Sequence, residues 1–245
     1  MELRFDMRGV MKHGSKLLGV LATFSLGCRG MLWDASSEGD TRVAGPDCSE
    51  RHCTLTFESG PEWASYAGVP STSGALSDAL GQSLGPAVDV CVNATVPSNC
   101  PSGALIYDRV RTRTGWRGGA SIPGAYWIWR ADATAEGHAP LEVSVFEKTF
   151  RLGAQPAGTI QISVDDFAEV FVNHTPVGSA GSIFYLTSAW RAQNLLTTMD
   201  LTPLLRSGEN IITIAVQNGP YACDSSDCSY AQDPAGVVFA GTFNW

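Results

Sequence analysis

Two adjacent aspartates, Asp165 and Asp166, are the residues whose types and spacing most directly suggest chemistry. They lie in the stretch SVDDFAEVFVNH (163–174), in which Glu169 follows shortly after them. Such a set of carboxylates could supply oxygen ligands to calcium, which binds about six to eight oxygen atoms in proteins. The alternative is structural, because aspartates in turns bond to nearby backbone groups. Calcium is therefore a candidate cofactor rather than an assigned one.

The same pair does not fit acid–base catalysis. Consecutive residues of a strand point to opposite faces, so Asp165 and Asp166 are not expected to converge on a substrate. Glycoside hydrolysis needs two carboxyl groups roughly 5–10 Å apart. The sequence also lacks the Gly-Xaa-Ser-Xaa-Gly and His-Glu-Xaa-Xaa-His motifs, a phosphate loop and a dinucleotide fingerprint. We expect a protein that is not an enzyme, with a carbohydrate-active hydrolase as the least favoured alternative.

Aromatic residues beside polar ones offer a second kind of chemistry. Sugar rings pack their C–H faces on aromatic rings, while their hydroxyls need hydrogen-bonding partners. Three segments, interpreted as loops, combine these residue types, and they give the candidate ligand-binding residues Trp190, Arg191 and Asn194, Trp116 and Arg117, and Tyr221 and Tyr230. Burial is the competing interpretation for any tryptophan, and we expect at least one of Trp127 and Trp129 to fill the core or to cap one end of the sandwich. The predicted partner is a glycan or cell-surface polysaccharide.

Short apolar stretches that alternate with period two must position these loops, and they predict an all-β sandwich. We expect strands at 53–59, 87–93, 103–111, 125–131, 141–152, 158–164, 169–173, 182–186, 194–201, 210–218 and 236–245. A tight hairpin turn is expected at Asn173-His174. A short helical turn is expected after Asp200, which can cap it. The Gly- and Ser-rich segment 59–86 is expected to be a long surface excursion.

Four marks in the C-terminal half resemble the galactose-binding-domain-like jelly roll, a module that accompanies bacterial glycosidases such as rhamnosidases. They are the Trp-Ile-Trp stretch 127–129, the pattern Phe146-Xaa-Lys148-Xaa-Phe150, the Val-Asp-Asp turn 164–166 that leads to Val-Asn, and the Gly-Glu-Asn stretch 208–210. His174 stands where this family usually has glycine after the asparagine, so the third mark is matched in part. The resemblance implies a single jelly-roll sandwich and leaves its function open.

The N-terminus has the pattern of an export signal. Basic residues precede the apolar run 17–27, which is too short to span a membrane and is followed by Cys28. The sequence SLGC resembles a bacterial lipobox, although Ser25 replaces the usual leucine. We expect a signal peptide at 1–27, a flexible tether at 28–50 and the jelly roll at 51–245. The protein is expected to be exported to a bacterial cell envelope through a lipid on Cys28, with plain secretion as the alternative.

Cysteine usage and charge agree with export. Six further cysteines form three close pairs, and proximity favours disulfides between Cys48 and Cys53, Cys91 and Cys100, and Cys223 and Cys228. The net charge is −8 without a compensating basic run, which disfavours nucleic-acid binding. The sequence therefore predicts a carbohydrate-binding or adhesive surface protein. The second hypothesis is a structural surface protein that does not bind glycans.

Overall fold

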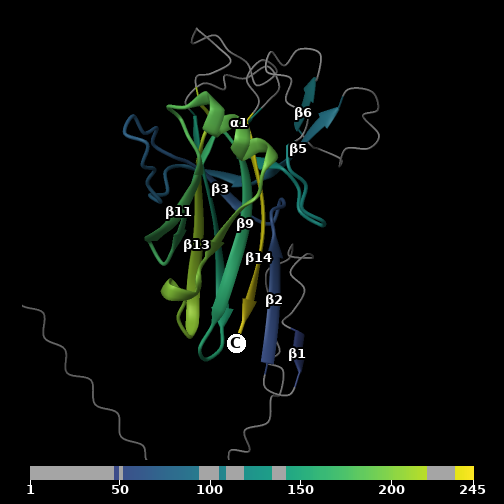
Figure 1. Ribbon diagram of the computed structural model, residues 1–245, viewed down its shortest axis with the longest axis vertical. Coiled ribbons are helices and arrows are strands. Elements are labelled where there is room, and N and C mark those ends of the chain that lie inside the picture. Colours follow the sequence, from purple (N-terminus) through teal and green to yellow (C-terminus); the bar gives the residue numbers. More distant parts are fainter. Residues whose placement is uncertain (1–46, 50–51, 94–104, 109–118, 134–141, 220–234) are drawn as a thin grey trace, which may run out of the picture. The chain divides into compact units, whose positions relative to one another are not determined.

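The computed structural model describes residues 47–49, 52–93, 105–108, 119–133, 142–219 and 235–245. These residues form two β-sheets that pack face to face (Figure 1). All of them belong to one unit, Ser37–Trp245. The prediction of an all-β sandwich is confirmed. Within these ranges no helix combines the length and the apolar character that a membrane crossing requires.

The first sheet is built around its C-terminal strand, β14 (Gly236–Asn244). Along one edge of β14 lies β9 (Ala157–Asp165), which also pairs with β12 (Thr197–Asp200). Along the other edge lie β2 (His52–Glu58) and the short β7 (Ile128–Trp129). The sheet is completed by β1 (Asp47–Ser49) beside β2, β5 (Val88–Asn93) beside β7, and β6 (Leu105–Asp108), which runs parallel to β5.

The second sheet has the strand order β11-β10-β13-β8-β3-β4 and is antiparallel throughout. Its strands are β3 (Ala64–Ala67), β4 (Ser83–Pro86), β8 (Val143–Leu152), β10 (Phe167–Val172), β11 (Thr175–Gly181) and β13 (Gly208–Gln217). The turn between β10 and β11 has φ values of 51° at Asn173 and 65° at His174, so the predicted tight hairpin turn is confirmed.

The inward positions of the two sheets form one core. Because side chains alternate along a strand, each long strand contributes every second residue to it. Examples are Ile160, Ile162 and Val164 of β9 and Ile212, Ile214 and Val216 of β13, all at most 1% exposed. Trp127 and Trp129 are 9% and 0% exposed, which confirms the core interpretation for both.

Aromatic rings join the sheets at the centre of this core. Phe57 of β2 stacks on Phe243 of β14 with a centroid distance of 4.9 Å. Phe150 of β8, on the opposite sheet, lies 5.1 Å from each of these rings. Trp63 meets Phe239 edge to face at 4.7 Å. Contacts of this geometry stabilise a fold beyond the area that the rings bury.

Residues 68–82, called here the covering segment, pack on the outer face of the second sheet. Leu76 is buried there with apolar side chains of β8, β10 and β13: Val143, Val145, Phe167, Phe171 and Ala215. Its backbone N–H donates to Glu169 Oε2 at 2.8 Å. Ser71 N–H donates to Gln217 Oε1 at 2.9 Å, and Asp78 Oδ2 lies 2.7 Å from His174 Nδ1. The predicted surface excursion is thus tied down, and it starts and ends with two unpredicted strands, β3 and β4.

The connection from β11 to β12 differs most from the sequence prediction. The strand predicted at 182–186 is wrong, because Ser182 Oγ accepts hydrogen bonds from the N–H groups of Phe184 and Tyr185 and turns the chain. The helix α1 (Leu186–Asn194) follows, where a loop was predicted. Ala189 and Ala192 are buried on its inner side. A 3₁₀ turn, η2 (Thr202–Leu204), occupies the predicted helical position, and Asp200 Oδ1 accepts from Thr202 N–H at 3.0 Å.

Candidate functional site

The outer face of the first sheet carries two rows of polar side chains that run across the strands. The register places Thr56 of β2, Thr242 of β14, Thr159 of β9 and Asp200 of β12 in the first row. These residues alternate with core residues, so their side chains point away from the core. The row therefore sets three hydroxyl groups and one carboxylate side by side on an open surface.

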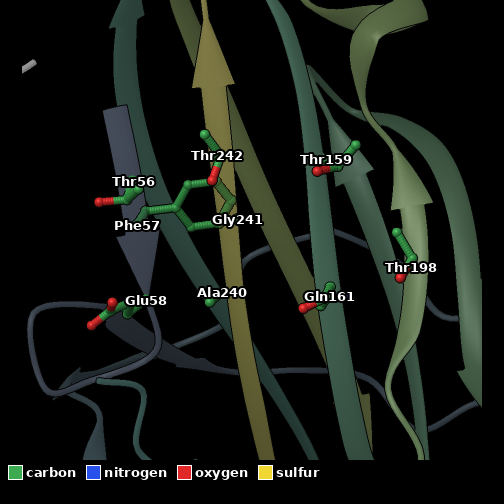
Figure 2. A pocket seen from close by; sticks show the side chains of 9 residues that line it. All are labelled: Thr56, Phe57, Glu58, Thr159, Gln161, Thr198, Ala240, Gly241 and Thr242. Atoms are coloured by element: carbon green, nitrogen blue, oxygen red, sulfur yellow. The ribbon is translucent and has the colours of Figure 1, made fainter. Parts of the chain in front are cut away.

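The second row lies beside the first and contains Glu58, Ala240, Gln161 and Thr198, in the same order of strands. Both rows border a groove of about 270 Å³, and Figure 2 shows its lining side chains on four neighbouring strands. The lining residues are Thr56, Phe57, Glu58, Thr159, Gln161, Thr198, Ala240, Gly241 and Thr242. The smallest lining residues, Ala240 and Gly241, lie on β14, and the longer Glu58 and Gln161 lie on the strands to either side of it.

The floor of the groove depends on Gly241. Phe57 lies opposite Gly241 in the register, and a side chain at position 241 would run into the Phe57 ring and approach the carbonyl of Thr159 to 2.6 Å. Glycine lets the Phe57 ring lie across β14, where it stacks on Phe243. The aromatic core thus reaches the underside of the groove at this position.

Glu58 is the charged end of the groove, and its backbone is held firmly. The Trp63 indole Nε1–H donates to the Glu58 carbonyl at 2.8 Å. The hydroxyl of the next residue, Ser59, donates to the Tyr126 carbonyl at 2.6 Å and accepts from Phe239 N–H at 3.0 Å. A carboxylate at the end of a strand that is fixed in this way can hold a ligand at a defined position.

The chemistry of the face is that of a hydrogen-bonding surface. Threonine hydroxyls donate and accept, the Gln161 amide does both, and Glu58 accepts. Such a set complements the hydroxyl groups of a polyol or a saccharide. Among the described residues, no three His, Cys, Asp or Glu side chains form a group that could hold a metal ion.

The predicted acidic pair lies elsewhere, at the junction of β9 and β10. Asp165 and Asp166 are 3% and 4% exposed. Asp165 Oδ1 accepts from the Gln193 side-chain amide, and Asp166 Oδ2 accepts from Gly219 N–H at 2.7 Å. The carboxylates therefore fix distant segments, not the neighbouring backbone that was predicted. Glu169 Oε2 bonds the covering segment instead, so the predicted calcium ligands do not form one group.

The two carboxyl groups also converge, contrary to the expectation from strand alternation. Asp166 lies in the bend after β9, where alternation no longer applies, and a hydrogen bond joins its carboxyl group to that of Asp165. Burial raises the pKa of Asp166, and the hydrogen bonds from its neighbours oppose this only in part. The structure supports a role in holding α1 and Gly219 in place.

The residues predicted in TSAWRAQN lie on α1, not on a loop. Arg191 and Asn194 are exposed on the helix, and so is Ser188 in its first turn. The exposed aromatics of this region, Phe184 and Tyr185, precede the helix and are 54% and 69% exposed. The side chain of Trp190 lies outside the described part of the structure.

The remaining predicted residues fall outside the described ranges: Trp116, Arg117, Tyr221, Tyr230, Cys28, Cys100, Cys223 and Cys228. Cys53 and Cys91 are both disulfide-bonded. The β1–β2 register sets Cys48 directly opposite Cys53, as the predicted pairing requires. The β1 strand lies inside the segment predicted as a tether.

Sequence reasoning missed the residues of the groove. The sequence did contain an indication, since Thr54, Thr56 and Glu58 alternate with apolar residues on the 53–59 stretch, as Thr159 and Gln161 do on the next long strand. Alternation shows which residues point outward, but it does not show which strands are neighbours. Only the pairing of β2, β14, β9 and β12 turns scattered threonines into a surface.

No protein-family model and no curated protein matches the sequence. Solved structures with a related backbone include a glycosyl hydrolase family 2 member from Bacteroides cellulosilyticus (17% identity, TM-score 0.37). They also include the Bifidobacterium dentium β-glucuronidase (14%, 0.35) and a β-glucuronidase from an uncultured Clostridium species (11%, 0.33).

These matches cover 77%, 80% and 82% of this chain, but only 20%, 31% and 30% of the respective solved structures. The chain thus spans less than a third of the length of each of these structures. At these TM-scores the similarity assigns neither a fold family nor an activity to the chain.

Proposed function

We propose that this chain is a carbohydrate-binding β-sandwich of the galactose-binding-like jelly-roll type, which holds a glycan on the open face of its first sheet without covalent chemistry. The observation that carries the proposal is the pair of cross-strand rows of hydroxyl, amide and carboxylate groups along the groove. Their donors and acceptors match the alternating hydroxyls of a saccharide.

The positions of the acids support binding rather than hydrolysis on this face. Glu58 stands on β2 and Asp200 on β12, with β14 and β9 between them. Three inter-strand spacings of about 4.8 Å separate the two carboxylates by roughly 14 Å. Glycosidases use pairs that are about 5–10 Å apart. Asp200 Oδ1 moreover already accepts a hydrogen bond from Thr202 N–H, at the start of η2.

A glycan array with the purified full-length chain tests the proposal. Thr159→Arg places a long cationic side chain in the groove and is expected to abolish the signal for the bound glycans. The matched control is Thr149→Arg, at an exposed position of β8 on the other sheet, which is expected to leave binding unchanged. Loss of binding in the control variant alone, or no signal for any glycan, would refute the proposal.

A second candidate function is that of a structural surface protein, which packs against another protein. Exposed apolar side chains at both ends of α1 favour it: Phe184, Tyr185, Leu195 and Leu196 are 54%, 69%, 62% and 36% exposed. Where such side chains form a contiguous apolar patch, the patch is a candidate for a protein contact. Replacing Tyr185 and Leu195 by serine should then weaken self-association in sedimentation, and the glycan array should stay silent for both the parent protein and this variant.

We also propose that the chain is exported and anchored through a lipid on Cys28. The basic N-terminal residues, the apolar run 17–27 and the sequence SLGC support this. Mass spectrometry of the mature N-terminus in the producing bacterium decides between the two export routes. A free Cys28 thiol, or a terminus beyond Cys28, would refute the anchor and support plain secretion.

A further inference from the structure

We infer that the glycan bound by this face carries no acidic groups, and that Glu58 is the residue that selects a neutral or amine-bearing saccharide over a uronate or a sulfated one. The inference rests on the proposed function and adds the ligand class to it. It follows from the positions of the two carboxylates on this face, Glu58 and Asp200, and from Tyr126, whose backbone is bonded to the residue after Glu58.

The groove has one charged side chain among its described lining residues, and that charge is negative. Glu58 is the only acid or base among the nine lining residues. Asp200 adds a second carboxylate to the neighbouring row, on the opposite flank of the face. A ligand carboxylate or sulfate laid along the rows would approach two like charges and find no cation among the lining side chains.

The fixed position of Glu58 makes this charge selective. The Trp63 indole bonds its carbonyl at 2.8 Å, and the pairing with Ala240 sets the direction of its side chain. The carboxylate lies against Gly124, where a Cβ atom would come within 2.6 Å of Glu58 Oε1. The chain therefore limits where the carboxylate can move at this end of the groove, of which Glu58 is a lining residue.

An exposed aromatic residue, which is not one of the nine lining residues, has its backbone bonded next to Glu58. Tyr126 is 39% exposed, and its backbone is bonded twice to Ser59, the residue after Glu58. Its N–H donates to the Ser59 carbonyl at 2.9 Å. The next residue, Trp127, is anchored in the core by a bond from Nε1 to the Ala120 carbonyl at 3.0 Å. A ring presented from such a rigid backbone suits stacking on the apolar face of a sugar.

The net charge of the chain acts in the same direction. At −8 the protein repels polyanions before contact, an effect that falls with added salt. An amine-bearing saccharide gains from both the long-range field and a direct bond to Glu58. A neutral saccharide uses the hydroxyl rows and the tyrosine ring alone.

Calorimetric titration of the purified full-length chain with three soluble oligosaccharides of equal length tests the inference. The ligands are a neutral β-linked glucose oligomer, the corresponding glucosamine oligomer and a galacturonate oligomer. We expect the glucosamine oligomer to bind best and the galacturonate oligomer to bind at least about tenfold more weakly than the neutral one at low salt.

The isosteric variant Glu58→Gln separates charge from shape. It is expected to weaken glucosamine binding by about tenfold and to bring galacturonate binding close to that of the neutral oligomer. Glu209→Gln, at an exposed position of β13, is the matched control and should change none of the three affinities. Tyr126→Ala should weaken all three ligands, and Tyr126→Phe should retain most of the affinity because the ring is kept.

The outcomes distinguish this inference from the proposed function. Preferential binding of galacturonate, or a preference that Glu58→Gln does not alter, overturns the inference while glycan binding stands. Absence of binding for all three ligands, together with a silent glycan array, overturns both. Circular dichroism and thermal unfolding of each variant show whether the fold is kept, so a lost affinity can be assigned to the groove.

Discussion

The side-chain amide of Asn173 donates a hydrogen bond to the side-chain oxygen of Asn210 across 3.0 Å. This bond joins the turn after β10 to the start of β13, two stretches that the sequence marks separately as Val-Asn and Gly-Glu-Asn. Asn173 also accepts from Ile211 N–H and donates to the Leu204 carbonyl. Two motifs that are distant in the sequence are therefore one polar network in the fold.

Asn210→Ala is expected to destabilise the protein by about 2–4 kcal/mol. Asn210 is fully buried and bonds Arg206 N–H, the Arg206 carbonyl and the Gly208 carbonyl besides Asn173, so its loss leaves several partly buried groups unpaired. Urea unfolding followed by tryptophan fluorescence measures the change. Asn244→Ala, which removes one exposed bond to Thr54, is the control and should cost under about 0.5 kcal/mol. Equal effects in the two variants would contradict the network.

Gly241→Ala is expected to cost about 1–3 kcal/mol, because the added methyl group must displace the Phe57 ring or the β9 backbone. Gly178→Ala on β11 is the matched control, since its nearest neighbour would be the Met199 sulfur at 3.4 Å, an ordinary contact. Thermal unfolding should separate the two variants by several degrees. A Gly241→Ala protein as stable as the control would show that the groove floor has room to adjust.

The buried Asp166 predicts a pH dependence of stability with a definite sign. Burial raises its pKa above the usual 3.8, so the folded protein keeps the proton to higher pH than the unfolded chain. The contribution of Asp166 is complete below the unfolded pKa and is lost as the pH rises through the folded value. Asp166→Asn should therefore gain stability relative to the parent as the pH rises from about 4 towards neutrality.

Asp200→Asn is the control of opposite sign. The hydrogen bonds from Thr202 lower the pKa of Asp200, so its contribution is present above the unfolded pKa and is lost as the pH falls. Urea unfolding of both variants over the same pH series measures the two slopes. If Asp166→Asn follows the parent protein at every pH, Asp166 does not hold a proton in the fold.

The inward-facing Lys148 lies 4.0 Å from Glu62 Oε1 and 5.9 Å from the centre of the Trp63 ring. Both charged side chains are largely buried, at 12% and 13% exposure. Lys148→Ala should cost about 3–5 kcal/mol because it leaves the Glu62 charge in the interior without this cation. Combining Lys148→Met with Glu62→Gln should recover most of the loss. A double-mutant cycle in urea measures the coupling, and additive effects would contradict it.

The strands and their faces could be read from the sequence because alternation is a local property. The patterns around Ile160, Ile162 and Val164 and around Val143 and Val145 predicted long strands, and the structure contains them as β9 and β8. The turn at Asn173-His174 was equally local, since asparagine tolerates positive φ.

The helix α1 and the groove could not be predicted in the same way. Ser182, which ends the extended chain before α1, acts through hydrogen bonds that a strand-like composition conceals. Glu58 and Gln161 are about a hundred residues apart, and they lie in one row only because β14, from the end of the sequence, pairs with both of their strands. The partners of Asp165 and Asp166 depend on long-range packing of the same kind.

The covering segment has a consequence for how a partner can approach. It occupies part of the outer face of the second sheet, where Leu76 fills the apolar positions. The corresponding face of the first sheet carries the two polar rows. The domain is therefore two-sided, with one face closed by its own chain and one face open to a polymer. Copies of the chain that bind along one polysaccharide would all turn the first sheet towards it. The covering segment on the second sheet would then face away from the polysaccharide in every copy.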